Sequence, residues 1–338
     1  YYSMNREVNM IKTILITTAI TSAMLFGISN IAKAENKIWT EKHSLSYSGK
    51  TKAGTGEQGY SKDYEHKIEG KYSEKFVLGH GDCGWEPNYN DCEADRGRTE
   101  RKGKYSKSRN VWYKFSFFID PSWDKATTAS IAQVKVSGVR PPVWMLRIDH
   151  GQLLWDNNAL GCRVKNLMSL DKLAGKWNDV VIYTNYSKKS RDWADGHYSA
   201  LWINGVRQDI STCSSQPQMG KYASAFHKKG ASFRYGLYHS YVSRELYVKA
   251  LVEGVEMKLA GWEDKGSKGS KTKSNSKSKT NTPWEVDWPV KLETKRIWFD
   301  NMHLRASKKN IWNMNMEWSP KDVCSSDNFY KPASCYTK

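Results

Sequence analysis

The sequence predicts an all-β fold, an antiparallel β-sandwich or jelly roll, from three observations. Short runs rich in β-branched and aromatic residues recur along the chain, and turn signals separate them. Aromatic residues make up 13% of the 338 residues, which is too many for a disordered chain. No long helical periodicity appears in the sequence. Many short strands at fairly regular spacing are typical of sandwiches and jelly rolls.

The clearest expected strands follow one another up to residue 304. They cover 111–119, 131–136, 143–148, 180–186, 198–203, 233–241 and 297–304. Asn204-Gly205 is a strong signal for a hairpin turn, after which a strand resumes at Val206. One short helix is expected around 169–174, and no longer helix is expected elsewhere.

The N-terminal residues have the features of an export signal. Lys12 precedes an apolar stretch over 14–31, and Ala32-Lys33-Ala34 offers a small-residue cleavage site. We therefore expect 1–34 to contain upstream residues and a cleaved signal peptide, and the mature protein to be secreted or periplasmic. No later apolar run is long enough to cross a bilayer, so we expect no stable membrane insertion.

Composition divides the remaining chain into two parts and an insertion. Residues 35–305 hold the expected strands and are predicted to form one jelly-roll domain. Within this range, 265–282 contains six lysines and no apolar side chain, which predicts a flexible insertion. Residues 306–338 follow as a C-terminal extension. We expect the protein to be a monomer.

Six cysteines in an exported chain predict disulfide bonds. Because six cysteines allow many connectivities, the pairing is a preference based on proximity along the chain. That preference is for Cys83–Cys92, Cys324–Cys335 and, as the remaining pair, Cys162–Cys213. A zinc site is the alternative, and neither a CxxC pair nor a His-x-His cluster supports it.

The balance of charge favours a negatively charged partner. The chain has 53 Lys and Arg against 35 Asp and Glu, a formal net charge of +18. The insertion over 265–282 carries only six of the 53 basic residues, so the rest of the chain is basic as well.

Three expected strands carry polar side chains on one face. Side chains alternate between the two faces of a strand, so every second residue shares a face. These residues are Arg98, Glu100 and Lys102 in the first strand, Gln133 and Lys135 in the second, and Arg234, Gly236, Tyr238 and Ser240 in the third. Each face alone is typical of a solvated surface. Together they predict a concave, basic, hydrogen-bonding groove, with Gly236 keeping its floor low.

These segments resemble the strand motifs of jelly-roll polysaccharide lyases. The segments RTERK at 98–102, QVK at 133–135 and RYGLY at 234–238 are similar to the R-T-E-L-R, Q-I-H and K-x-G-x-Y strands of the alginate lyases. The surroundings resemble the heparin lyase I and glucuronan lyase group in four further segments: Gly81-Asp82-Cys83, Gly175-Lys176-Trp177, Trp202-Ile203-Asn204-Gly205 and Asp300-Asn301. The match spans roughly 70–305 and implies a concanavalin-like jelly roll.

The resemblance also implies β-elimination in an anionic, uronate-containing polysaccharide such as glucuronan, alginate or a heparin-type chain. Such a site must neutralise the uronate carboxylate, remove the C5 proton and protonate the leaving glycosidic oxygen. By this resemblance, Gln133 and Arg98 bind the carboxyl group, and Glu100 orients Arg98. Tyr238 donates the proton, and Arg234 and Lys135 lower the pKa of Tyr238. Glu100, Lys102 and Ser240 are expected to bind substrate.

The chain departs from the alginate-lyase pattern at Lys135, where that pattern has histidine. A lysine with its ordinary pKa of about 10.4 is protonated and cannot act as a base. The base would then be Tyr238 itself, or a histidine such as His80 or His150, since His239 is expected to face away from the groove.

Other functions were weighed against this one. A non-catalytic lectin-like module that binds acidic glycans is the main alternative, and Lys135 in place of histidine favours it. Extracellular nucleic-acid binding rests on charge and aromatic content alone and is not expected. A hydrolase with paired carboxylates has less support, because Glu100 is the only acid on the groove strands.

No cofactor is required by these motifs. Calcium is the one candidate, because Asp156-Asn157-Asn158 could supply oxygen ligands, although such clusters are more often turns.

Overall fold

The computed structural model describes residues 44–48, 59–68, 70–82, 85–86, 89–91, 94–125, 127–187, 197–255 and 288–305. The predictions made for 1–34, 265–282 and 306–338, and for the pairs Cys83–Cys92 and Cys324–Cys335, lie outside these residues. Within the described ranges, no helix has the length and apolar character needed to span a bilayer.

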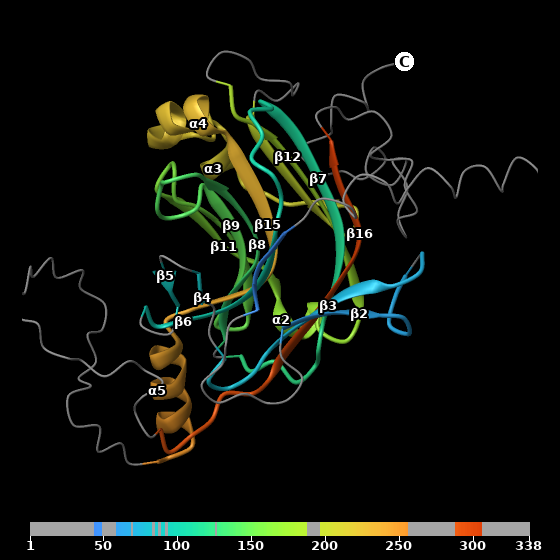
Figure 1. Ribbon diagram of the computed structural model, residues 1–338, viewed down its shortest axis with the longest axis vertical. Helices are drawn as coiled ribbons and strands as arrows, with labels where there is room; N and C mark the ends of the chain where they lie inside the picture. Colours follow the sequence, from blue (N-terminus) through green and yellow to red (C-terminus); the bar gives the residue numbers. More distant parts are fainter. Residues whose placement is uncertain are drawn as a thin grey trace, which may run out of the picture. The chain divides into compact units, whose positions relative to one another are not determined.

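Two seven-stranded antiparallel sheets face each other (Figure 1). Sheet A has the order β1 (Ser44–Ser48), β6 (Arg96–Lys102), β15 (Ala231–Ser240), β8 (Thr128–Val136), β9 (Trp144–Asp149), β10 (Gln152–Asn157) and β11 (Cys162–Ser169). Sheet B has the order β14 (Val206–Arg207), β13 (Ser199–Ile203), β12 (Trp177–Asn185), β7 (Asn110–Ile119), β16 (Lys295–Arg305), β3 (Ser73–Leu78) and β2 (Gly59–Asp63). The predicted antiparallel sandwich of the jelly-roll type is confirmed.

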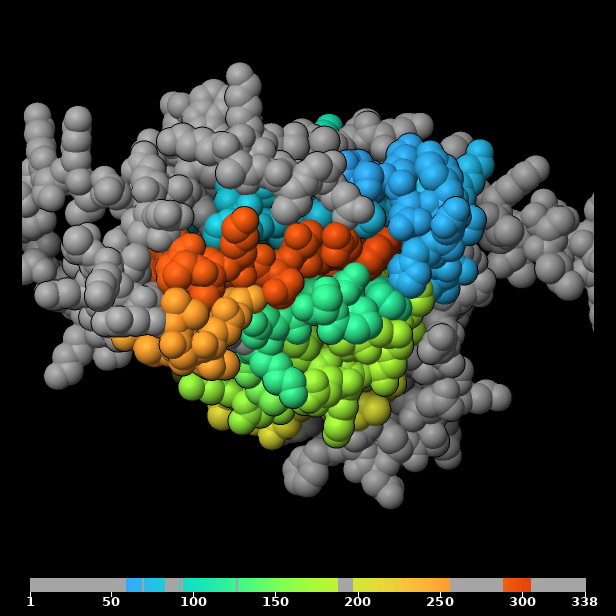
Figure 2. Space-filling view, turned by 90° about the horizontal axis from the view of Figure 1, so that it is seen from below, coloured from blue at the N-terminus to red at the C-terminus, as the bar shows by residue number. Residues whose placement is uncertain are grey.

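Short elements join the sheets. A two-stranded sheet is formed by β4 (Trp85–Glu86) and β5 (Tyr89–Asn90). The helices are α2 (Leu170–Leu173), α3 (Ser211–Ser214), the 3-10 helix η1 (Gly220–Tyr222), α4 (Ala223–Lys229) and α5 (Val242–Val252). Seen from below, β16 lies between β7 and the β2–β3 hairpin, with α5 beside it (Figure 2).

Aromatic side chains fill the space between the sheets. Phe233 and Tyr235 project from β15 toward sheet B, where Phe115 lies 6.0 Å from Phe233 and Phe299 lies 5.3 Å from Tyr235, measured between ring centroids. Phe76 of β3 stands edge-on to Tyr235 at 5.8 Å. Each such ring contributes a large buried apolar area as well as a favourable edge-to-face contact. This packing fixes which face of β15 is interior and which is exterior.

All the strands expected from the sequence are present, together with the hairpin at Asn204-Gly205 and the helix α2. The strands β2, β3, β10 and β11 and the helix α5 were not expected. Helix α5 packs onto residues before β16 through a cluster of Val242, Leu246, Ala250, Trp288, Val290 and Leu292. Its buried side also includes Ser243 and Glu245, and these polar residues interrupt the apolar pattern by which a helix is recognised.

Glu245 fastens α5 to both sheets. Its carboxylate lies 2.6 Å from His239 Nε2 of β15 and 2.8 Å from Lys295 Nζ of β16, and all three side chains are buried. Burial alone would raise the pKa of Glu245, but the charges of His239 and Lys295 and their hydrogen bonds outweigh it and hold the pKa well below its ordinary value. The interior direction expected for His239 is confirmed.

The disulfide between Cys162 and Cys213 is present. It joins the edge strand β11 of sheet A to α3, which follows the edge strand β14 of sheet B. The preferred pairing is confirmed for these two cysteines.

Gly236 is required by the backbone of β15. Its φ is +124°, in the region that side chains disfavour, and an added Cβ would overlap the carbonyl oxygen of Thr99 and come within 2.9 Å of Phe76. This Cβ would therefore meet the neighbouring strand and the core. The need for glycine comes from this close approach, which the sequence-based explanation of a low groove floor did not anticipate.

We expect Gly236→Ala to lower the free energy of unfolding by about 3 kcal/mol or more, because it adds backbone strain and a steric overlap. Gly161→Ala is the matched control, since Gly161 also has a positive φ but has no atom within 4 Å of the Cβ position. The control should cost about 1 kcal/mol. Urea denaturation measures both, and equal losses would contradict the role of the close approach.

Glu245→Gln is expected to lower the free energy of unfolding by about 3–5 kcal/mol, because it leaves Lys295 buried without its counter-charge. Lys125→Gln serves as control. It breaks a 2.9 Å ion pair with Asp171 in which the two side chains are 70% and 68% exposed, and it should cost less than about 1 kcal/mol. If both variants unfold at the same urea concentration, Glu245 does not fasten α5 as described.

Candidate functional site

The register of β15 between β6 and β8 decides which polar side chains meet. Arg234 lies opposite Gln133 of β8 and opposite Lys102 of β6. Tyr238 lies opposite Arg98 of β6. Directly opposed residues of antiparallel strands point to the same side of the sheet, so the three strands present their polar side chains together. The shared face predicted from the sequence is confirmed.

We call this surface the polar face. It is the side of sheet A that points away from sheet B, and it comprises Arg98, Glu100, Lys102, Gln133, Lys135, Arg234 and Tyr238. Ser240 lies on the same side, at the end of β15 and opposite Arg96.

Arg98 is neutralised by Asp91, a residue that the sequence did not single out. Its Nε and Nη2 atoms each lie 2.9 Å from a carboxylate oxygen of Asp91, and its Nη1 lies 3.7 Å from Glu100. Burial would lower the pKa of Arg98, but Glu100 and Asp91 outweigh it and raise the pKa. The guanidinium group lies 4.5 Å from the ring centroid of Tyr238. A cation held by two carboxylates is thus fixed against the phenol ring.

Nothing in the sequence pattern relates Asp91 to Arg98. The two residues belong to different elements, and no periodicity connects a residue that follows β5 with one inside β6. The expectation that Glu100 alone orients Arg98 was therefore incomplete.

Gln133 is fixed by Glu100. Its Nε2 donates a hydrogen bond to Glu100 Oε1, while its buried Oε1 accepts no hydrogen bond within the described part of the chain. Leaving a buried acceptor unsatisfied costs free energy, which a ligand donor recovers. The second N–H of Nε2 can serve a carboxylate, and Oε1 can serve a sugar hydroxyl.

Arg234 carries a buried positive charge with no counter-ion. It is 4% exposed, and its Nε has no hydrogen-bond partner. No ion pair or hydrogen bond of its side chain is present among the residues that the structure describes. A buried guanidinium without an anion is costly, and its planar donors match a carboxylate. Arg234 therefore suits an anionic ligand.

Lys135 has an environment that changes its acidity. Burial has the largest effect and lowers its pKa, and the positive charges of Arg234 and Arg98 lower it further. Glu100 raises the pKa by a smaller amount, and the result is a pKa of about 8. The expectation of a lysine with an ordinary pKa is wrong here. Near pH 8, about half of the Lys135 side chains are neutral amines that can accept a proton.

The histidines considered as bases have partners elsewhere. His239 contacts Glu245 on the interior side of β15. His80 accepts a hydrogen bond of 3.1 Å at Nδ1 from the backbone of Leu292. His150 lies 2.9 Å from Asp149, next to the turn between β9 and β10. None of these contacts lies on the polar face, where Lys135 contributes an amine and Tyr238 a phenol.

The candidate calcium ligand Asp156 is engaged by arginines. Its Oδ2 accepts hydrogen bonds of 3.2 Å from Arg147 and 2.8 Å from Arg163. The described residues contain no group of three or more His, Cys, Asp or Glu side chains placed to hold a metal ion.

The chain is similar to known proteins in sequence and in fold. The model of a family described as polysaccharide lyase matches residues 38–303. No curated protein matches the chain. Among solved structures, an endo-β-1,4-glucuronan lyase from the fungus Trichoderma reesei has a TM-score of 0.40 and 14% identity, over 79% of this chain and 95% of that one.

Two further solved structures are similar to the chain. The alginate lyase AlgAT5, of polysaccharide lyase family 7, has a TM-score of 0.41 and 13% identity, over 78% of this chain and 93% of that one. The cellulose-induced protein Cip1 has a TM-score of 0.38 and 9% identity, over 80% and 95% of the two chains.

Proposed function

The chain belongs to the polysaccharide lyase family, and from this membership we propose that it cleaves an acidic, uronate-containing polysaccharide by β-elimination. Glucuronan, alginate and heparin-type chains are the candidate substrates. The observation that carries the proposal is the buried, unpaired charge of Arg234 beside the half-satisfied amide of Gln133. A lyase needs such a place for the carboxylate next to the reacting carbon.

In this proposal the uronate carboxylate binds Arg234 and the free N–H of Gln133. Neutralising that carboxylate makes the C5 proton more acidic and stabilises the negative charge that develops as it leaves. Arg98, on the neighbouring strand β6, also stabilises this negative charge. Asp91 and Glu100 already balance most of the positive charge of Arg98. Lys102, opposite Arg234, adds positive charge at the edge of the carboxylate site.

Lys135 and Tyr238 are proposed to move the two protons. The neutral amine of Lys135 takes the C5 proton, the electron pair forms the C4–C5 double bond, and the C4–O bond breaks. Tyr238 gives its phenolic proton to the departing oxygen. Solvent then returns a proton from the lysine to the tyrosine, so the enzyme is regenerated. In the rival scheme Tyr238 serves both steps and needs the ammonium form of Lys135 to lower its pKa, so the rate would not rise as Lys135 loses its proton.

The disulfide between Cys162 and Cys213 supports an oxidising location. We therefore propose that the mature enzyme is secreted or periplasmic and meets its polysaccharide outside the cytoplasm. The lectin-like alternative is not favoured, because the family match is to lyases.

Purified enzyme incubated with glucuronan, alginate or heparin-type chains should release unsaturated ends that absorb in the near ultraviolet. Tyr238→Phe should abolish this absorbance, because the leaving oxygen loses its proton donor, while the polysaccharide still binds. Tyr64→Phe is the matched control, since Tyr64 is exposed after β2 and outside the polar face, and it should retain the full rate. Absence of product from the wild-type enzyme on every polyuronate would refute the proposed reaction, and binding without product would favour the lectin-like alternative.

The pH dependence of kcat/KM, which reports the pKa values of the free enzyme, should identify the base. The wild-type kcat/KM is expected to rise as pH increases through about 8, the pKa of Lys135, because only the neutral amine accepts a proton. Lys135→His should keep part of the activity and move this rise to lower pH, since imidazole has an ordinary pKa of about 6.5. Lys135→Met should remove the rise along with most of the rate. An unshifted rise in Lys135→His would show that Lys135 is not the base.

A further inference from the structure

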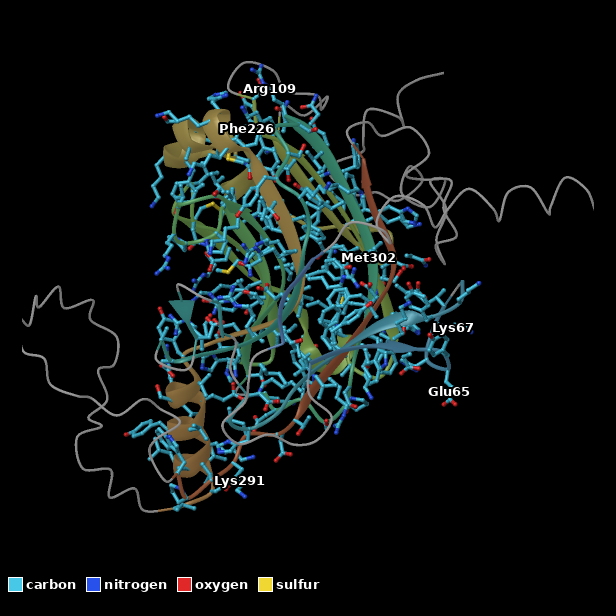
Figure 3. The ribbon with its side chains drawn as sticks, in the orientation of Figure 1. Glu65, Lys67, Arg109, Phe226, Lys291 and Met302 are labelled. Carbon is cyan, nitrogen blue, oxygen red and sulfur yellow. A yellow bond between two sulfur atoms is a disulfide. The ribbon has the colours of Figure 1, made fainter. Side chains whose placement is uncertain are left out.

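A second basic surface lies where β6 and β8 end and β15 begins. It is formed by four exposed lysines, Lys104, Lys107, Lys228 and Lys229, and we call it the strand-end surface. Lys104 and Lys107 follow β6, while Lys228 and Lys229 close α4 just before β15. Arg109 and Phe226 of α4 lie at this end of the molecule, and Lys291 lies at the opposite end (Figure 3).

Backbone contacts hold these like charges together. Ser106 and Ala231 exchange two hydrogen bonds of 2.8 Å. Gly230, with φ of +76°, packs so closely that an added Cβ would lie 2.5 Å from the carbonyl oxygen of Ser106. Lys229 Nζ reaches to 3.9 Å from the Cβ position of Gly138, in the turn after β8. The fold thus brings three basic segments together although their charges repel one another.

No acidic residue offsets this charge from within the same segments. The sequence contains no Asp or Glu over 101–119, 125–148 or 210–244. None of the four lysines forms an ion pair within the part of the chain that the structure describes. At the opposite end of the molecule, by contrast, Lys249 lies 2.9 Å from Glu293 and 3.6 Å from Glu253. The strand-end surface thus gathers four exposed lysines without an acidic neighbour in their own segments, whereas Lys249 at the opposite end lies between two glutamates.

The strand-end surface adjoins the candidate site. Lys102 and Lys135, both on the polar face, are the last polar-face residues of β6 and β8 before the chain leaves the sheet. Arg140, in the turn after β8, acts electrostatically on Lys135. Lys104 lies six residues beyond Arg98, four of them along β6, which places it at most roughly 20 Å away. A short oligosaccharide bound at Tyr238 ends before this surface, whereas a long chain extends beyond the site.

We propose that the strand-end surface binds acidic groups of the same polysaccharide outside the cleaved linkage, and that it makes the enzyme selective for long, continuously charged chains. This inference rests on the proposed function for the identity of the polymer. Exposed lysines without partners contribute little singly, but a cluster of one sign raises the local concentration of a polyanion and its association rate by about tenfold or more. Salt screens this attraction at distances beyond the Debye length, which is about 10 Å at 0.1 M ionic strength.

The test compares two variants of equal net charge in the Tyr238→Phe background, where binding is measured without turnover. One carries Lys104→Gln, Lys107→Gln, Lys228→Gln and Lys229→Gln. The control carries Lys62→Gln, Lys71→Gln, Lys172→Gln and Lys176→Gln, which are exposed on the β2–β3 hairpin and around α2. Calorimetry with a long polyglucuronate and with a uronate trisaccharide, at low and moderate salt, gives the affinities.

The first variant should bind the polymer about tenfold more weakly, lose most of the salt dependence and bind the trisaccharide unchanged. The control should match the Tyr238→Phe parent. An equal loss of affinity in both variants would show that only net charge matters. An equal loss of affinity for polymer and trisaccharide would place these lysines in the cleavage site. Either result overturns the inference. Failure of the proposed reaction is distinguished separately, by the absence of unsaturated product from the wild-type enzyme.

Discussion

Arg234 holds a buried positive charge that no carboxylate of the described residues balances, and the candidate site is organised around that charge. Three other buried cations lie against carboxylates: Arg98 against Asp91, Arg101 against Glu74, and Lys295 against Glu245, each at 2.9 Å or less. Since a buried charge without a counter-ion lowers stability, the environment of Arg234 is best explained by a ligand that supplies the anion. The family to which the chain belongs acts on polysaccharides, and an acidic sugar supplies that group.

The same charge governs the chemistry of its neighbour. Arg234 lowers the pKa of Lys135, after the larger effect of burial, so a lysine becomes a usable base near pH 8. A bound uronate would partly cancel the charge of Arg234, but it also brings the acidic C5–H to the amine. Glu100 links these parts, because it accepts a hydrogen bond from Gln133 and lies 3.7 Å from Arg98. Carboxylate binding and proton transfer are thus coupled through one small set of charges.

Alternation along the strands was enough to predict which side chains share a face, because burial of the aromatic residues fixes the interior side of each strand. It could not predict that β15 lies between β6 and β8, and the expectation that the three faces meet rested on their shared polar character and on the family resemblance. Asp91 and the acidity of Lys135 depend on residues that are distant in sequence, so no local pattern contains them. Helix α5 was missed because Glu245 occupies an inward position and is balanced by residues of both sheets.

The central claim is that Arg234 receives the uronate carboxylate. The most direct measurement compares the affinity of a uronate tetrasaccharide with that of its carboxyl-reduced, neutral counterpart, in Tyr238→Phe and in Tyr238→Phe with Arg234→Gln. The account predicts that carboxyl reduction weakens binding about tenfold or more in the first protein and much less in the second, because the group that reads the charge has been removed. The same loss in both proteins would contradict it, since the carboxylate would then be bound elsewhere.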